Sequence, residues 1–163
     1  MNSSPHQQFL EIIKSFPTCM LVSIGPGNLA HSRPMAVARV DFDGDTYLVT
    51  SSNSAMLQEI ADHPDVVLIF QGTCQFASLA GEATISDDRN LIDELWSESW
   101  RVWFPAGKAD PTLRILRIIP SGGEYWDNGG LKGMKYLFTS VSALMLGTKP
   151  AESDPSQHAK IDF

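Results

Sequence analysis

Several signals that would assign this chain to a familiar class are missing from its sequence. Basic residues are few: 12 Lys and Arg stand against 19 Asp and Glu, for a formal charge of −7, which disfavours binding to nucleic acid or to an anionic membrane surface. Only two cysteines are present, Cys19 and Cys74. Both lie in strand-like apolar context, so we expect buried thiols and no disulfide framework. The longest apolar run, residues 66–70, is too short to span a bilayer.

Short catalytic and nucleotide-binding motifs are missing too. The sequence has no HExxH or paired CxxC metal motif, no GxxxxGK or GxGxxG phosphate loop, and no GxSxG nucleophile elbow. Its four histidines have no metal-ligand spacing: His6, His31, His63 and His158. We therefore predict that the protein has no metal site. No charged segment followed by an apolar core stands at the N-terminus, which predicts a protein without a signal peptide in a reducing cytoplasm.

The composition is that of a globular domain. Of 163 residues, 43% are apolar and 19% are charged, enough for one domain with a buried core. Turn signals separate a series of strand-like runs, which we place at residues 18–24, 29–42, 46–51, 66–71, 74–85 and 112–119, with a further strand that ends at 124–127. About six to seven antiparallel strands joined by hairpins favour a mainly β fold with flanking helices, closed or nearly closed into a barrel.

Helical patterns flank these strands. Ser4 can cap a helix that starts at Pro5, Gln7 completes a capping box, and apolar residues continue on one face to residue 16. Short helices are expected from about residues 56 and 87. Within the second strand run, Pro34 predicts a bulge or an edge.

The chain divides into two parts of one domain. Residues 1–128 carry the strand pattern and form the barrel domain. Residues 129–163 form a C-terminal extension, for which a Gly-rich hinge, a helix over residues 134–145 and a frayed tail over residues 147–163 are expected.

One arginine stands out in the second strand run. In the segment from His31 to Met35, Arg33 is a cation in a stretch that is otherwise apolar or small. A buried arginine needs acceptors, and its planar fork suits the carbonyl-rich edge of a ring. The alternative is an arginine exposed on an edge strand.

A second unusual segment is a strand end rich in hydroxyl groups. Residues 50–54 read Thr-Ser-Ser-Asn-Ser and lead directly into a helix. Hydroxyls together with free backbone N–H groups at a helix start form an anion site suited to a phosphate. Capping alone requires only one of these five residues, so the surplus indicates a ligand.

The third unusual feature is a set of aromatic residues: Trp96, Trp100, Trp103, Phe104 and Trp126. A flat aromatic ligand is bound well between such walls. Trp96 shares a helical face with leucines and is interpreted as core. Trp103 and Trp126 lie in a loop and at a strand end, which makes them better candidates for contact with a ligand.

Four motifs occur in one order along the chain: SRPM at 32–35, YLVTSSNSAMLQEI at 47–60, WFPAGKADP at 103–111 and LRIIPSGGEYWD at 116–127. With this order and spacing, roughly residues 8–128 resemble the pyridoxamine-phosphate-oxidase-like flavoproteins, and they are most similar to the general-stress-protein subgroup. The resemblance implies an FMN-binding split β-barrel. It also implies non-covalently bound FMN and a homodimer with two flavins at the subunit interface.

The resemblance also implies which residues form the flavin site. Arg33 corresponds to the arginine that faces the pyrimidine edge of the isoalloxazine ring. Ser54 and the backbone at Ala55 and Met56 correspond to the phosphate turn. The remaining residues that the resemblance implies are Ser32, Pro34 and Met35 beside Arg33, Val49, Thr50 and Ser51 along the ring and ribityl chain, Trp103 and Phe104 in a loop from the partner subunit, and Trp126 as a late aromatic.

The chain departs from the family pattern at Met56, where lysine is frequent. A missing charge-assisted contact to phosphate is worth about 1.5–3 kcal/mol, so FAD is an alternative to FMN. If the side chain at position 56 points toward the phosphate, Met56→Lys is expected to tighten FMN binding.

Two functions are compatible with these features. One is an oxidoreductase that transfers hydride at the flavin N5, for which the protein supplies orientation and the cofactor supplies the chemistry. No side chain is an obvious acid or base, so no catalytic residue is assigned. The basic substrate-phosphate cluster of true pyridoxamine-phosphate oxidases is not recognisable near the C-terminus. The alternative is a non-catalytic flavin-binding stress protein that acts as a sensor or reservoir.

Overall fold

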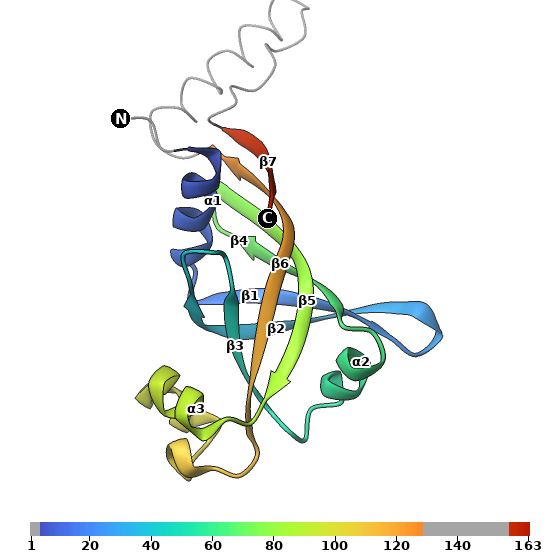
Figure 1. Cartoon of the computed structure of the whole chain (residues 1–163), viewed down its shortest axis with the longest axis vertical. Coiled ribbons are helices and arrows are strands. Elements are labelled where there is room, and N and C mark those ends of the chain that lie inside the picture. Colours follow the sequence, from blue (N-terminus) through green and yellow to red (C-terminus); the bar gives the residue numbers. More distant parts are fainter. Residues whose placement is uncertain (1–3, 129–156) are drawn as a thin grey trace, which may run out of the picture.

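The structure is a computed structural model that describes residues 4–128 and 157–163. Figure 1 shows strongly bent strands that wrap around one another, with α1 along the upper part and α2 and α3 near the lower end. The elements in chain order are α1 Pro5–Lys14, β1 Thr18–Gly25, η1 Pro26–Asn28, β2 Leu29–Val40, β3 Thr46–Ser51, α2 Met56–Asp62, β4 Asp65–Gln71, β5 Gln75–Ser86, α3 Arg89–Leu95, η2 Glu98–Val102, η3 Gly107–Ala109, β6 Leu113–Asp127 and β7 His158–Asp162.

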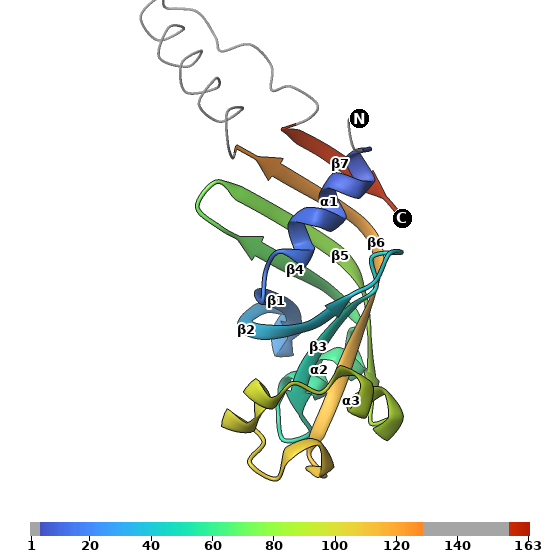
Figure 2. The ribbon, with the colours of Figure 1, turned by 90° about the vertical axis from the view of Figure 1, so that its left-hand side faces the viewer.

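The first helix forms as its sequence predicts. The Ser4 hydroxyl accepts a hydrogen bond from the Gln7 backbone N–H, and the Gln7 side chain accepts one from the Ser4 N–H, which completes the capping box. Phe9 and Ile13 on the apolar face are fully buried against the sheet. Figure 2 shows this helix lying across the strands.

The seven strands form a single antiparallel sheet in the order β3-β2-β1-β4-β5-β6-β7, and an additional pairing between β3 and β6 closes six of them into a barrel. β7 is an extra strand on the far part of β6. The predicted fold class, a mainly β split barrel with six to seven strands, is confirmed.

β6 is one continuous strand, so the prediction of two separate strands over residues 112–127 was wrong. The Pro-Ser-Gly-Gly segment that resembles a turn forms a bulge: Gly81 of β5 pairs with Pro120 and Ala80 with Gly122, which leaves Ser121 as an extra residue. A Cβ at position 81 would lie 2.3 Å from the Ile119 carbonyl oxygen. Glycine at 81 therefore allows the two strands to stay paired through the bulge.

The C-terminal end of the chain differs from the prediction. Residues 158–162, interpreted from the sequence as frayed tail, form β7, and Ile161 is buried opposite Gly123 of β6. The free edge of β6, burial of Ile161 in the core cluster and the contact of Phe163 with Phe9 of α1 favour this pairing more than the local composition disfavours it. The expected hinge and the helix over residues 134–145 lie outside the described residues.

The split in the barrel lies between β2 and β3. Residues Leu29–Ala36 of β2 pair with β1, whereas pairing with β3 begins only at Ala36, which lies opposite Val49. Beyond Val49, β3 pairs with β6 alone. Pro34 lies on the stretch of β2 that has one neighbouring strand, which confirms the predicted edge. At such a position the missing N–H of proline costs no hydrogen bond between strands. The diverging strands open a wedge on the outer face of the sheet.

Two apolar clusters result. The first fills the barrel and includes Leu21, Leu48 and Met56, and the second lies outside β3 and β6 beneath α3. Cys19 is buried, and burial raises the pKa of its thiol to about 12. Cys74 is exposed, in the β4–β5 turn, so the prediction of a second buried thiol was wrong. Within the described residues, no helix is long and apolar enough to cross a membrane.

Candidate functional site

A cavity of about 540 Å³ occupies the wedge between β2 and β3. Its floor is the outer face of the sheet, where the side chains of Ala36 and Val49 meet across the last β2–β3 pair. The eleven lining residues are Thr18, Pro34, Met35, Ala36, Val49, Thr50, Ser51, Asn53, Ser54, Trp103 and Phe104.

One side of the cavity is formed by polar groups at the end of β3. Thr50 and Ser54 make no hydrogen bond to any other described residue through their hydroxyls, and Ser51 Oγ accepts one from the Asn53 N–H at 3.3 Å. The N-cap residue of α2 is Ala55, and no side chain forms a capping hydrogen bond to this helix. The capping interpretation of this hydroxyl run is therefore wrong, and the hydroxyls are available to a ligand.

The opposite side is aromatic. Phe104 is buried in the outer cluster, whereas Trp103 is 61% exposed at the rim. The segment that carries them is anchored by Trp100, which is buried and packs edge-on against Trp96 at a ring-centroid distance of 5.7 Å. The aromatic wall is thus fixed at its base and faces solvent at its tip.

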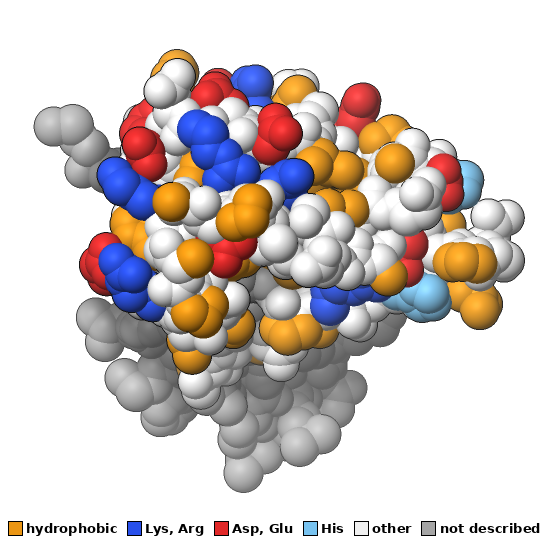
Figure 3. All heavy atoms as spheres, turned by 90° about the horizontal axis from the view of Figure 1, so that it is seen from below, with side chains coloured by type: hydrophobic (Ala, Val, Ile, Leu, Met, Phe, Trp, Pro, Cys, Tyr) orange, Lys and Arg blue, Asp and Glu red, His pale blue; other side chains and the backbone are white. Residues whose placement is uncertain are grey.

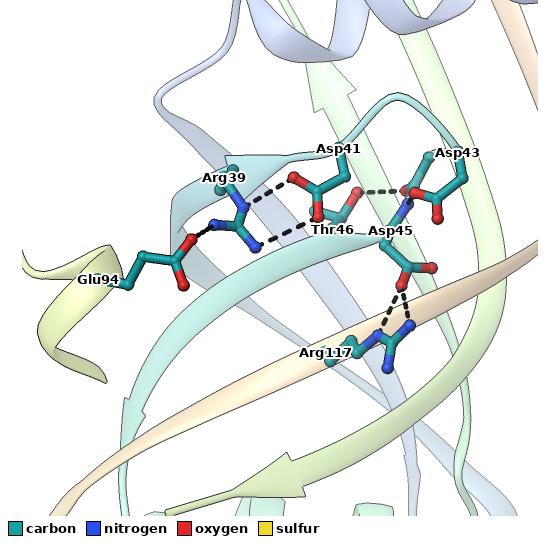
Figure 4. A network of polar contacts seen from close by, with 8 residues as sticks. Arg39, Asp41, Asp43, Asp45, Thr46, Glu94 and Arg117 are labelled. Atoms are coloured by element: carbon teal, nitrogen blue, oxygen red, sulfur yellow. Dashed lines mark hydrogen bonds and ion pairs between the residues drawn. The ribbon is translucent and has the colours of Figure 1, made fainter. Parts of the chain in front are cut away.

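Ion pairs link α3 to β2 and β6 to the turn between β2 and β3 (Figure 4). Arg39 of β2 pairs with Asp41, which follows the same strand, and with Glu94 of α3. Its guanidinium lies 4.6 Å from the centre of the Tyr47 ring. Asp45 pairs with Arg117 of β6 in the same region. Arg39 thus connects Glu94 of α3 to β2, and it lies over Tyr47 of the outer cluster.

The chemistry of the cavity lining is uniform: none of the eleven residues carries an ionisable side chain. Its polar side-chain groups are the hydroxyls of threonine and serine, the amide of Asn53 and the indole N–H of Trp103. A molecule bound here would be oriented by hydrogen bonds and apolar contact.

Arg33 makes a different contact from the one its sequence context suggested. Its guanidinium donates to Glu59 Oε2 of α2 at 2.9 Å, and it does not line the cavity. Arg33 lies on the face of β2 opposite Pro34 and Ala36. Met35 shares that face and still lines the cavity, so the pairing with Glu59, and not alternation alone, directs the guanidinium away from it. Arg33 does lie on an edge stretch of β2, but the predicted alternative of an exposed arginine is wrong, because the side chain is three-quarters buried. No local pattern around Arg33 indicates this carboxylate partner, which lies 26 residues further along the chain.

Eight of the thirteen predicted flavin-site residues line the cavity: Pro34, Met35, Val49, Thr50, Ser51, Ser54, Trp103 and Phe104. Their contact with a flavin remains a prediction. Arg33, Ser32 and Ala55 do not line the cavity. Ser32 and Ala55 are exposed to solvent. Trp126 lies far from the cavity along β6. It stacks on His158 near the end of the strand, whereas the cavity lies by the start of the strand, where Leu113 pairs with Ser51.

The side chain of Met56 is fully buried in the barrel core. It does not point toward the hydroxyl run, so the condition under which Met56→Lys was expected to tighten FMN binding is not met. The helical spacing from Met56 to Ile60, which is also buried, was the available signal for a core position.

Three lining residues were missed in the sequence. Asn53 lies within the hydroxyl run and Ala36 follows Pro34 at the spacing of one strand face, so both carried a local signal. Thr18 lies in the site because it pairs with Ala36 across the β1–β2 hairpin, which only the register reveals.

Comparison with known proteins places this arrangement in a family. A family model described as "Pyridoxamine 5'-phosphate oxidase like" matches residues 4–151. General stress protein 26 of Bacillus subtilis is 32% identical over 120 residues, which cover 70% of this chain and 82% of the relative.

Solved structures agree with this assignment. A general stress FMN/FAD binding protein from Xanthomonas citri superposes with a TM-score of 0.65 at 28% identity, over 76% of this chain and 88% of that one. General stress protein 26 from Bacillus anthracis has a TM-score of 0.66 at 23% identity, over 74% and 92%, and supports the fold alone. With the split barrel, the family match and the curated relative in agreement, the chain belongs to the pyridoxamine 5'-phosphate oxidase-like family, in its general stress protein 26 subgroup.

Proposed function

We propose that this protein binds FMN non-covalently in the cavity between β2 and β3, with FAD as the alternative flavin. The observation that carries the proposal is the lining itself, which combines apolar and aromatic side chains with a row of hydroxyls that make few contacts of their own. The Xanthomonas citri relative is described as an FMN/FAD binding protein, which supports the same ligand class.

The residues present fit a flavin. A volume of about 540 Å³ is within the ordinary range of cofactor pockets. Met35, Val49 and Phe104 offer apolar surface to a flat ring, and Thr50 and Ser54 offer hydroxyls to a polar chain. No lining residue is cationic, so the phosphate would be held by neutral donors, which explains why FAD stays an alternative.

The chain's own contribution to chemistry is orientation and exclusion of water. The buried Phe104 and the sheet floor shield one part of the cavity, and Trp103 at the rim would cover another. A bound flavin supplies hydride transfer at N5 without an acid or base from the protein. We propose that the protein is an oxidoreductase that acts by this hydride transfer. We also propose that it is located in the cytoplasm. The uncharged wall equally suits a sensor or reservoir without turnover, which is the second candidate.

The proposed activity is tested by anaerobic reduction. The purified protein is loaded with FMN, and a reduced nicotinamide is added under argon while absorbance near 450 nm is followed. Bleaching faster than that of free FMN is expected for an oxidoreductase. Bound flavin that bleaches no faster than free FMN favours the reservoir, and protein that retains no flavin after gel filtration contradicts flavin binding.

A homodimer is the expected oligomeric state. Val102 and Trp103 are largely exposed beside the cavity, and Figure 3, which views this end of the molecule, shows hydrophobic side chains on the surface. Pairing of two copies would cover such side chains on both subunits. Light scattering of the flavin-loaded protein at micromolar concentration should therefore give twice the 17.9 kDa chain mass. The monomer mass would contradict this prediction.

A further inference from the structure

Three polar side chains from two strands meet at Glu59 of α2. Glu59 Oε2 accepts hydrogen bonds from the Ser23 hydroxyl of β1 at 2.6 Å and from Arg33 of β2 at 2.9 Å. Glu59 Oε1 lies 2.8 Å from His31 Nδ1, also of β2. A single carboxylate therefore joins the helix to two strands of the barrel.

Burial and charge make this carboxylate a strong tie. The side chain of Glu59 is only 10% exposed and Ser23 is fully buried. Hydrogen bonds from Ser23 and His31, together with Arg33, lower the pKa of Glu59 to about 2. The carboxylate is charged at neutral pH, and a charge with so little exposed surface is stabilised by the hydrogen bonds of its partners.

The packing around His31 shows that the cluster is closely fitted. A Cβ at position 25 would lie 2.5 Å from the His31 ring and 3.3 Å from Glu59 Oε1. Gly25 pairs with Leu29 at the end of the β1–β2 hairpin. The absence of a side chain at Gly25 therefore gives the imidazole room to reach Glu59.

The position of α2 depends on such tertiary contacts. The helix has seven residues and no side-chain cap, and a helix this short is not stable by itself. Met56 and Ile60 hold it through the core, and Glu59 supplies its polar attachment. The hydroxyl run at residues 51–54 leads directly into this helix.

We propose that Glu59 is a positioning residue of the flavin site. It fixes α2 to β1 and β2, and thereby sets the separation between the polar side of the cavity at residues 51–54 and the β2 segment at residues 34–36, which lines the cavity beside its floor. The attachment is close to both segments along the chain, since Arg33 adjoins Pro34 and α2 follows Ser54 after one residue. Glu59 does not line the cavity, so it acts through the residues that it holds. The inference rests on the proposed flavin function.

The test compares Glu59→Gln with Glu124→Gln. Glu124 Oε1 lies 2.7 Å from His158 Nε2, a pair of similar length on the part of β6 remote from the cavity. FMN affinity is measured by fluorescence titration, folding by far-UV circular dichroism, and the bound state by visible circular dichroism at saturating FMN. Glu59→Gln is expected to weaken FMN binding at least tenfold and to change the visible spectrum, whereas Glu124→Gln stays within twofold of wild type.

His31→Ala keeps the proposal testable if Glu59→Gln does not fold. It removes a partly exposed member of the cluster and leaves Ser23 and Arg33 on the carboxylate, so a smaller loss of three- to fivefold is expected. Unchanged FMN affinity in a folded Glu59→Gln protein would overturn the role of Glu59. If Glu59→Gln does not fold, unchanged FMN affinity in His31→Ala would do so. An equal loss of affinity in Glu124→Gln would also overturn it. A wild type that binds no flavin would overturn the proposed function together with this inference.

Discussion

Met56→Lys is expected to lower the free energy of unfolding by about 3–5 kcal/mol, the typical cost of an uncompensated charge in a protein core. The Met56 side chain has no exposed surface and packs in the barrel core with Leu21, Leu48 and Ile60. A lysine there must either lose its proton or force the start of α2 out of the core. Denaturant unfolding monitored by tryptophan fluorescence measures the loss.

Met56→Leu is the matched control. It keeps the apolar character and nearly the volume of the side chain, so a change below about 1.5 kcal/mol is expected. Tighter binding of FMN relative to riboflavin by a stable Met56→Lys protein would contradict the core assignment, because it would put the side chain at position 56 next to a phosphate.

Ala36→Phe is expected to weaken FMN binding by about 100-fold, equivalent to about 2.7 kcal/mol. Ala36 lies at the floor of the cavity, where β2 and β3 begin to diverge. A phenyl ring at this position would occupy space that the proposed isoalloxazine ring requires, and a well-packed sheet cannot move aside without strain. FMN titration measures the loss, and circular dichroism confirms that the variant folds.

Ala30→Phe separates a blocked cavity from a general effect of the larger side chain. Ala30 lies on the same strand and the same face as Ala36, but it is exposed near the hairpin end and does not line the cavity. Its replacement should leave FMN affinity within twofold of wild type. Equal affinity in the folded Ala36→Phe and Ala30→Phe proteins would show that FMN does not occupy this cavity.

Where local signals agreed with tertiary packing, the sequence predicted the structure. The capping box of Ser4 and Gln7 formed α1, the hairpin at residues 43–44 joined β2 to β3, and Asp88 capped α3 near its expected start. Each of these features depends on residues within a few positions of one another, so the sequence contains the whole interaction.

Where an element depended on a partner distant in the sequence, prediction from the local sequence pattern was wrong. The segment at residues 120–123 has turn composition, yet β5 keeps it extended through a bulge. Residues 158–162 have tail composition, yet the free edge of β6 pairs with them. Cys74 follows a strand-like pattern, yet it lies in an exposed turn. In each case the outcome was decided by backbone pairing, to which local propensity contributes little.

The candidate site shows the same division. The sequence by itself determined that hydroxyls follow β3, that aromatic residues precede β6, and that a cation lies beside Pro34, since these are properties of composition and order. Only the tertiary structure decided that the first two form opposite walls of one cavity, whereas Arg33 faces Glu59. The physical reason is the closure of the barrel: the β3–β6 pairing joins segments more than 60 residues apart, and strand alternation then assigns each side chain to one face of the sheet.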